Sequence, residues 1–233
     1  MKALPIVLLA LFLITSCKDD TTKEEVEIQD IEQDTEEVSI AQKIANAHGF
    51  EHWENVKSID FTFQVDTESK EGNERIWKWN PNTNEVTRFK EDETISYLRS
   101  DVDSTTMTID RAFINDKYWL MVPFQLVWDS SATISEPSKA EAPVSKNSMN
   151  KITLTYPSDS GGYTPGDAYD VFYDDSFVIR EWTFRRGNSK EPTMSTTFES
   201  YRDYNGVILA LEHKMAEAAG WNLNFTNVNV TFK

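Results

Sequence analysis

The sequence predicts a mainly β, α+β fold in which an antiparallel sheet curves over its own core or over a helix. Three observations support this prediction: many segments alternate apolar and polar residues, short turn sequences separate them, and there is too little helical pattern to cover both faces of a sheet. With 233 residues, 39% hydrophobic and 12% aromatic, the chain can fill one core and needs no second folded domain.

The first predicted element is a short helix. Ser39 is followed by Ile40, Ile44 and Ala47 at helical spacing, so Ser39 is the expected N-cap, and Gly49 is the expected stop.

Strand patterns begin after this helix. In 58–65, four apolar residues alternate with four polar ones, which is the period of a half-buried strand. Further strands are predicted over 75–79, 85–89 and 94–98, and Pro81-Asn82-Thr83-Asn84 supplies turn chemistry between the first two.

The second half of the chain begins with a predicted helix over 108–114, which leads into the apolar segment 118–124. The Ser, Ala, Pro and charged residues of 130–149 predict a mobile loop. Asn205-Gly206 predicts a tight hairpin, because both central positions of the favoured two-residue turn have positive φ. The strands predicted in this half are 151–156, 169–173, 178–184, 194–204, 207–215 and 223–232.

Residues 1–16 have the pattern of a lipoprotein signal peptide. Met1 and Lys2 precede the apolar stretch 3–14, which is too short to cross a hydrocarbon core that takes about 20 helical residues. Ile14-Thr15-Ser16-Cys17 resembles the bacterial lipobox, in which the cysteine is acylated and becomes the mature N-terminus. A plain secretory signal would not need the cysteine. We therefore expect Cys17 to carry acyl chains, palmitate among them, that anchor the protein to a membrane without spanning it.

Residues 17–38 are predicted to form an acidic, disordered tether, and 39–233 a single antiparallel β domain. Ten acidic residues and two lysines lie in 18–38, and its apolar residues are too sparse to offset the entropy of ordering it. An acidic helix is the alternative. Lys18, Asp19 and Asp20 resemble the signal that directs lipoproteins of some Gram-negative bacteria to the outer face of the outer membrane. We therefore expect surface exposure, with a periplasm-facing position as the alternative.

The formal net charge of −16 argues against nucleic acid as a partner, since phosphate binding requires clustered Lys and Arg. With a single cysteine, the chain forms no internal disulfide, so its stability outside the cytoplasm depends on core packing.

The order of motifs along the chain resembles a family of uncharacterised bacterial lipoproteins, whose pattern is similar to the lipoprotein carriers LolA and LolB and the sensor domain RseB. The motifs are Ala47-His48-Gly49, Trp53, Ser58, the 118–124 segment, Gly162-Tyr163-Thr164-Pro165-Gly166-Asp167 and the Gly206 hairpin. The resemblance covers roughly 40–232. It implies an open half-barrel with one or two helices packed on the concave side of the sheet, an apolar cavity for acyl chains, and the lipoprotein export machinery as a partner. It brings no catalytic residue, metal or cofactor.

One sequence motif resembles a catalytic site. Pro157-Ser158-Asp159-Ser160-Gly161-Gly162 is similar to the nucleophile segment of trypsin-like proteases, and His48 lies in a segment like the one that holds their histidine. Ser158 and Tyr163 depart from that pattern, and His48 lies at a predicted helix end. We interpret the segment as a turn, and we expect no enzymatic activity.

Two sets of residues are candidates for metal binding, and each favours a structural role. His48 and His52 are four residues apart, but Gly49 interrupts the helix and no third ligand stands nearby. The second set matches no EF-hand spacing and is typical of solvated turns. Its members are Asp159, Asp167, Asp170, Asp174 and Asp175.

The aromatic residues supply the candidate ligand site. Trp77 and Trp79 share strand parity and face one way, either into a cavity or into a core closed by the 40–47 helix. His213 should point inward, as a satisfied core residue or as a polar contact in a cavity. The candidate cavity residues are Trp77, Trp79, Trp119, Phe124, Trp182 and His213.

Two functions are compatible with these patterns. The first is a lipid-anchored, non-enzymatic envelope lipoprotein that binds a hydrophobic moiety, such as acyl chains or a lipoprotein, in an apolar concavity. The second is a cell-surface module that binds a glycan or a protein through exposed aromatic rings. A continuous cavity between sheet and helix would favour the first, and a filled core with surface tryptophans the second.

Overall fold

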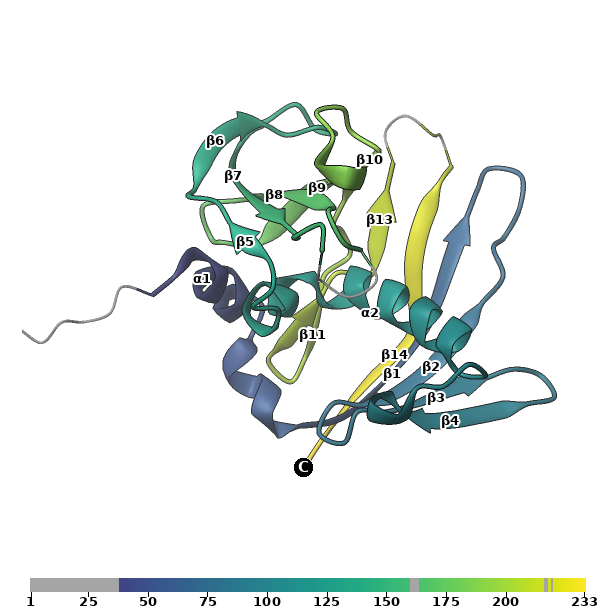
Figure 1. Ribbon diagram of the computed structural model, residues 1–233. Helices are drawn as coiled ribbons and strands as arrows, with labels where there is room; N and C mark the ends of the chain where they lie inside the picture. The colour runs from purple at the N-terminus through teal and green to yellow at the C-terminus, as the bar shows by residue number, and fades with distance from the viewer. Residues whose placement is uncertain (1–37, 160–163, 216–217, 219) are drawn as a thin grey trace, which may run out of the picture. The chain divides into compact units, whose positions relative to one another are not determined.

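A computed structural model of the chain describes residues 38–159, 164–215, 218 and 220–233. The residues from Glu37 to Lys233 form one compact unit. Two groups of antiparallel strands make up most of this unit, and helix α2 (Met107–Trp128) lies across both groups (Figure 1). The predicted mainly β fold with an accompanying helix is confirmed.

The first sheet has six strands in the order β13-β14-β1-β2-β3-β4. Their bounds are β1 Val56–Asp66, β2 Arg75–Asn80, β3 Glu85–Phe89, β4 Thr94–Leu98, β13 Glu212–Lys214 and β14 Asn222–Phe232. Each neighbouring pair is antiparallel. The alternating residues Ile59, Phe61 and Phe63 are buried on one face of β1, as the period of two predicts.

The second sheet also has six strands, in the order β10-β9-β8-β7-β5, with β6 paired to β7 as well. Their bounds are β5 Thr133–Ile134, β6 Ser138–Glu141, β7 Ser148–Thr155, β8 Ala168–Tyr173, β9 Ile179–Arg185 and β10 Met194–Thr197. The two sheets adjoin where β10 lies beside β13, because Glu199 and Glu212 form an antiparallel bridge and Lys214 N donates to Thr197 Oγ1 at 3.0 Å. Within the described residues, the strand order ends at β4 and β5 without closing into a barrel.

Helix α1 (Ile40–Ala47) begins and ends as the sequence predicts. The Ser39 hydroxyl accepts a hydrogen bond from Gln42 N at 3.2 Å, and Gly49 follows the helix with φ of 83°. A 3₁₀ turn, η1 (Phe50–Asn55), then leads into β1. A side chain on Gly49 would collide with the carbonyl of Gly206, so the end of α1 can pack closely on the chain there.

Helix α2 is three times longer than the predicted helix over 108–114, because it continues through the apolar segment 118–124. It follows a short 3₁₀ turn, η2 (Arg99–Asp101). Pro123 lies inside α2, and Met121 has non-helical dihedrals of φ −110° and ψ 16°. Proline removes one helical hydrogen bond and crowds the preceding turn, which accounts for the kink. Packing on both sheets keeps the segment helical despite the proline.

The tight hairpin at Asn205-Gly206 is confirmed. It joins β11 (Arg202–Tyr204) to β12 (Val207–Leu209), and its two central residues have φ of 52° and 94°. The predicted strands over 194–204 and 207–215 are each interrupted. In the first, Ser200 has a positive φ of 53°, which ends the extended backbone between β10 and β11.

The segment 130–149, predicted as a loop from its composition, contains β5 and β6. Both pair with β7, and their exposed faces explain why an edge strand can be rich in Ser, Lys and Glu. Glu181, buried on β9, accepts hydrogen bonds from Val144 N at 2.6 Å and Ser145 N at 3.0 Å. These contacts fix the chain between β6 and β7.

Two hydrophobic clusters fill the interior, and α2 contributes to both. The first lies against β1, β2 and β14 and takes Phe113 and Phe124 from α2. The second lies against β7, β8 and β9 and takes Val122 and Leu126 from α2, together with Ile44 of α1. The long helix therefore bridges the two sheets through its buried side chains.

Candidate ligand cavity

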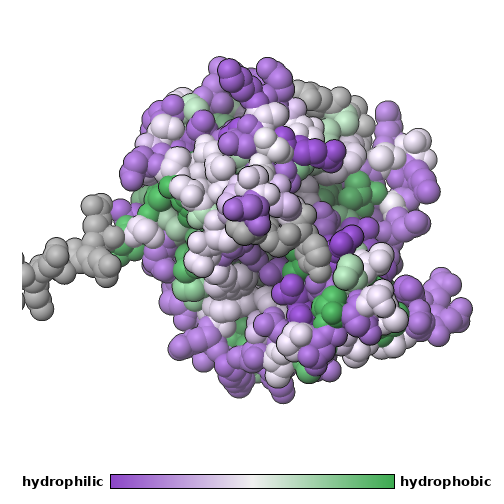
Figure 2. Space-filling model, in the orientation of Figure 1, coloured by the Kyte–Doolittle hydropathy of each residue, from purple (hydrophilic) through white to green (hydrophobic). Residues whose placement is uncertain are grey.

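A cavity of about 1290 Å³ lies along α2, between the helix and the inner faces of both sheets. Its wall includes residues of α2, β1, β8, β9, β10 and β14. Figure 2 shows a hollow with hydrophobic side chains inside it, above α2 and toward β13 and β14 of Figure 1, and hydrophilic side chains around it. Ligand-binding cavities typically have volumes of about 300–1,000 Å³, so this one has room for a substantial ligand.

One side of the cavity is a continuous aromatic wall. Its members are Tyr118, Trp119, Tyr156, Tyr169, Trp182 and Phe184. Tyr169 stacks on Trp182 with ring centroids 5.1 Å apart and on Phe184 at 5.2 Å, and Trp119 meets the edge of Trp182 at 4.4 Å. These contacts hold the rings against one another.

Strand register explains this wall. Tyr169 of β8 pairs directly with Phe184 of β9, and Trp182 stands two residues before Phe184 on the same face. Tyr118 and Trp119 reach the same space from α2, where Tyr118 lies 5.2 Å from Tyr169 between ring centroids.

The other side of the cavity is apolar. Its members are Phe63, Val65, Ile114, Met194, Trp221 and Leu223. They come from β1, β10, α2, β14 and the residue before β14, so the first sheet and the helix both contribute. Ile114, Met194 and Trp221 are only half-buried, and their exposed area is the apolar surface that a ligand could cover.

Charged side chains also line the cavity, and most of them are cationic. The cations are Arg75, Arg99, Arg111, Lys117 and Arg186, and the acids are Asp129 and Asp167. The excess of positive charge contrasts with the formal net charge of −16 for the chain. Arg75 donates from Nε to Asp116 Oδ2 at 2.7 Å, and Arg99 donates from Nε to Asp110 Oδ1 at 2.9 Å.

Lys117 differs from these arginines because it is almost fully buried, with 8% of its surface exposed. Its Nζ lies 5.2 Å from the ring centroid of Trp79 and 5.8 Å from that of Trp128. Burial, helped by the positive charge of Arg99 and opposed by Asp129 and Asp110, lowers the pKa of Lys117 to about 8. The side chain is therefore still mostly cationic at neutral pH.

The tyrosines of the wall are held neutral. The Tyr118 and Tyr156 hydroxyls are 3.1 Å apart and share a hydrogen bond. Burial raises the pKa of Tyr156 to about 12 and the pKa of Tyr118 well above its usual range. Two buried polar atoms of the wall, Trp182 Nε1 and Gln125 Oε1, have no hydrogen-bond partner among the described residues.

The structure places the candidate cavity residues in two different settings. Trp119 and Trp182 line the cavity. Trp77, Trp79 and Phe124 are at most 5% exposed and belong to the first hydrophobic cluster, closed by α2 where the sequence suggested the 40–47 helix.

His213 also lies in the interior, behind the aromatic wall. Its Nδ1 lies 3.1 Å from Thr197 O, and its ring is 5.3 Å from that of Trp119. Burial lowers the pKa of His213 to about 3, so the ring is neutral. The expected lipidation site Cys17 and the sorting residues Lys18, Asp19 and Asp20 lie outside the described residues.

Sequence reasoning missed Lys117 and the tyrosines as wall residues. For Tyr118 the signal that could have found it is helical spacing, since Arg111, Ile114, Tyr118 and Gln125 share one face of a 22-residue helix. The sequence predicted a helix over 108–114 followed by a separate apolar segment over 118–124, so this continuous face was not recognised. Lys117, Tyr156 and Tyr169 gave no such signal.

The histidine pair does not form a metal site. His48 is buried at the end of α1 with Nδ1 2.8 Å from Ile44 O, and burial lowers its pKa to about 4, whereas the His52 side chain is 48% exposed and points elsewhere. In the part of the chain that the structure describes, no group of three or more His, Cys, Asp or Glu side chains is arranged to hold a metal ion.

Most of the aspartate cluster has structural partners. Asp170 pairs with Arg185 at 3.0 Å, Asp174 with Arg180 at 2.8 Å and Asp175 with Lys139 at 3.1 Å. Residues 160–163, which include the serine of the protease-like motif, lie outside the described residues.

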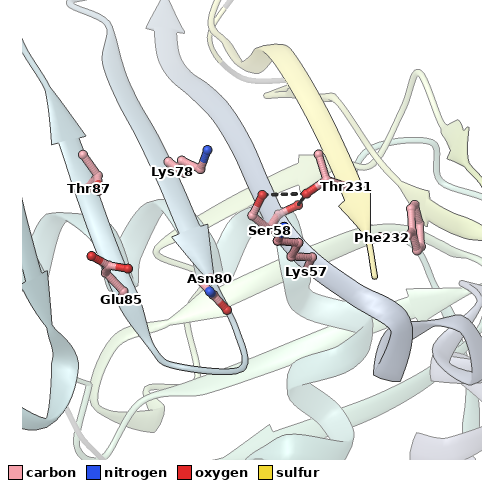
Figure 3. Close-up of a pocket in the computed structure, with 8 residues that line it drawn as sticks. All are labelled: Lys57, Ser58, Lys78, Asn80, Glu85, Thr87, Thr231 and Phe232. Atoms are coloured by element: carbon pink, nitrogen blue, oxygen red, sulfur yellow. Dashed lines mark hydrogen bonds between the residues drawn. The ribbon is translucent and has the colours of Figure 1, made fainter.

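A second hollow, of about 370 Å³, is lined by Lys78 and Asn80, which alternate along β2 with the buried Trp77 and Trp79 and so lie on the other face of the sheet (Figure 3). Lys78 and Asn80 of β2 line it beside Ser58 of β1 and Thr231 of β14, whose hydroxyls are 2.7 Å apart. Its lining residues are polar apart from Phe232 and come from one sheet only, so the α2 cavity is the better candidate site.

Several solved structures are similar to this chain, among them the following two. A LolA superfamily protein from Nitrosomonas europaea has 9% sequence identity and a TM-score of 0.47, and the match covers 83% of this chain and 94% of that one. A DUF1329 family protein from Desulfovibrio piger has 6% identity and a TM-score of 0.46, with 82% and 91% of the two chains covered. No protein-family model and no curated protein sequence matches. No helix in the described ranges has the length and apolar character to cross a membrane.

Proposed function

We propose that this protein binds a hydrophobic moiety, the acyl chains of a lipid or of a lipoprotein, in the cavity along α2, and that it performs no catalysis. In this proposal acyl chains on Cys17 hold it at the outer membrane, and Lys18, Asp19 and Asp20 direct it to the cell surface. The export machinery for lipoproteins would deliver it there.

The observation that carries the proposal is the cavity itself. About 1290 Å³ of space remains between a helix and two sheets although twelve aromatic and aliphatic side chains line it. Apolar side chains normally close such a space, because removing them from water is worth about 25 cal/mol per Å². An apolar ligand would supply the burial that the chain itself leaves incomplete.

The burial of the tryptophans disfavours the glycan-binding alternative. All seven tryptophans lie in the described residues, and none of them is exposed. Of the aromatic residues in the described ranges, only Phe89, at 36%, counts among the exposed large hydrophobic side chains. A flat stacking platform for sugar rings needs more exposed aromatic area than this.

The proposal is tested with the full-length protein from its host envelope, reconstituted in lipid nanodiscs and exposed to a photoactivatable dodecanol. Mass spectrometry then identifies the cross-linked peptides. We expect cross-links in α2, β9 and β14. Ile114→Glu should reduce them about tenfold, because it puts an unpaired carboxylate among apolar side chains.

Ile76→Glu is the matched control, since Ile76 is 38% exposed and does not line the cavity. It should leave the cross-linking unchanged. Cross-links spread over the surface, or equal losses in the two variants, would contradict the proposal.

A further inference from the structure

We infer that the cavity selects acyl ligands with an anionic head group, and that Lys117 recognises that head group. This inference rests on the proposed function and names the class of ligand.

The first observation is the setting of Lys117. The residue is 8% exposed, lines the cavity, and lies beside two tryptophan rings. Its ammonium group forms no ion pair and no hydrogen bond with any described residue. An ammonium group has three N–H donors, and a buried charge normally has a paired, hydrogen-bonded partner.

The rings of Trp79 and Trp128 compensate only part of this burial. A cation near an aromatic face gains about 0.5–2 kcal/mol, but the ring accepts no conventional hydrogen bond in place of water. The two rings therefore leave the three donors without a hydrogen-bond acceptor among the described residues, in a residue that lines the cavity. A carboxylate or phosphate head group would accept from them and neutralise the charge, which is the strong kind of hydrogen bond.

The second observation is that four other charged residues of the wall have protein partners. Asp129 accepts from Ser131 N at 3.0 Å and from Ser131 Oγ at 2.6 Å, and Asp167 accepts from Gly187 N at 2.7 Å. Arg75 and Arg99 each pair with a buried aspartate of α2. Lys117 is thus the buried cation of the wall whose charge the fold leaves unpaired.

The third observation is a further donor. Trp182 lines the same cavity, and its Nε1 is buried and has no acceptor among the residues that the structure describes. In the first cluster, Trp77 Nε1 donates to Asp116 Oδ2 at 2.8 Å, whereas Trp79 Nε1 also has no acceptor among the described residues. An indole N–H can only donate, so it suits an anionic or carbonyl oxygen of a ligand and not a cationic head group.

The experiment compares three competitors with the same chain and different heads: dodecanoate, dodecanol and dodecyltrimethylammonium. Each displaces the photoactivatable dodecanol from the nanodisc-bound protein at pH 7. We expect dodecanoate to compete about tenfold better than dodecanol, as one charge-assisted hydrogen bond would give. The trimethylammonium compound should compete least. In Lys117→Met, dodecanoate and dodecanol should compete equally.

Lys78→Met is the matched control, because Lys78 lies on the opposite face of the first sheet in Figure 3 and should retain the wild-type preference. Equal competition by dodecanoate and dodecanol in the wild type would overturn the inference, as would a preference that survives in Lys117→Met. In a further arm, inorganic phosphate alone is added as the competitor. If it displaced the dodecanol probe as effectively as dodecanoate does, the site would bind free anions and not acyl ligands with an anionic head group. If the dodecanol probe never labels the cavity, the proposed function fails instead.

A measurement on the unaltered protein covers the case in which Lys117→Met does not fold. Raising the pH from 7 to 10 discharges Lys117, whose pKa is about 8, while Tyr156, with a pKa of about 12, stays neutral. The charged groups that act on Lys117 are Arg99, Asp110 and Asp129. The preference for dodecanoate should disappear, and its persistence at pH 10 would contradict the inference.

Discussion

Two groups of aromatic side chains flank α2, and they differ in whether the space beside them is filled. The packed group consists of Trp53, Trp77, Trp79, Phe113, Phe124 and Trp128. The cavity group is the aromatic wall of six rings described above. Ring centroids lie 4.6–6.3 Å apart among Trp53, Trp79, Phe124 and Trp128 and 4.4–6.1 Å apart along the wall. Ring contacts alone therefore do not distinguish a core from a binding site.

The difference comes from the elements that surround each group. In the packed group, η1 places Trp53 against the first sheet, so helix, turn and sheet close on the same rings. In the cavity group the rings of β8 and β9 meet only one side of α2, and the apolar side chains of β1 and β14 lie across the opening. Residue type determines that a surface is apolar, and the arrangement of elements determines whether protein covers it.

The largest expected effect comes from breaking the packed group. Phe124 is fully buried and contacts Phe50, Trp53 and Trp128, so Phe124→Ala should lower the free energy of unfolding by about 3–5 kcal/mol. Urea denaturation measures this change. Phe89→Ala at an exposed position should cost less than about 1 kcal/mol. Equal losses at the two positions would contradict the description of the packed group.

A smaller effect is expected from His213, which lies between the two groups and touches both Trp119 and Phe225. In the unfolded chain His213 takes up a proton near pH 6.5, whereas in the fold its pKa is lowered to about 3 by burial. The contribution of neutral His213 to the free energy of unfolding should thus be fully present above pH 6.5. It should fall as the pH decreases toward 3, by up to about 1.4 kcal/mol per pH unit.

The measurement is urea denaturation at pH 6.5 and at pH 5, where His213 should account for a loss of about 2 kcal/mol. In His213→Leu this contribution to the pH dependence should be absent. The contribution of His48, whose pKa is also lowered, to about 4, should remain. If the variant lost stability with falling pH as steeply as the wild type, His213 would not be held neutral in the fold.

The smallest expected effect is the difference in stability between the same substitution, Trp to Phe, in the packed group and in the cavity group. Trp77 and Trp182 are equally buried, but only Trp77 donates its N–H to a protein acceptor, Asp116. Trp77→Phe should therefore cost about 1–2 kcal/mol more stability than Trp182→Phe, because it leaves a buried carboxylate with one donor fewer. The two unfolding free energies are compared under identical conditions. A cost at Trp182 that matches the cost at Trp77 would mean that its N–H is also satisfied.

Most of the fold could be predicted because its signals are local. The alternation in β1, the cap at Ser39 and the Asn205-Gly206 turn each depend on a few neighbouring residues. The full length of α2 was missed because Pro123 and a run of large apolar residues are typical of a strand or a helix end. Packing on two sheets overrides that local preference.

The site was less predictable than the fold. Trp119 and Trp182 stand in the cavity wall and Trp77 and Trp79 in the core, although all four are tryptophans in strongly apolar segments. Which of them meets unfilled space depends on contacts between residues far apart in the chain, such as Trp119 with Trp182. Lys117 gave no signal at all, since a lysine in a helix is ordinarily solvated.

The proline in α2 has a consequence for how this architecture can vary. Pro123 has no N–H, so the series of backbone hydrogen bonds along the helix is interrupted in its C-terminal third. Substitutions in the part of α2 before the break, or in the part after it, can therefore change how that part packs on the sheets without changing the packing of the other part. Related chains could in this way have a deeper or shallower cavity along α2, and bind longer or shorter ligands, with the same two sheets.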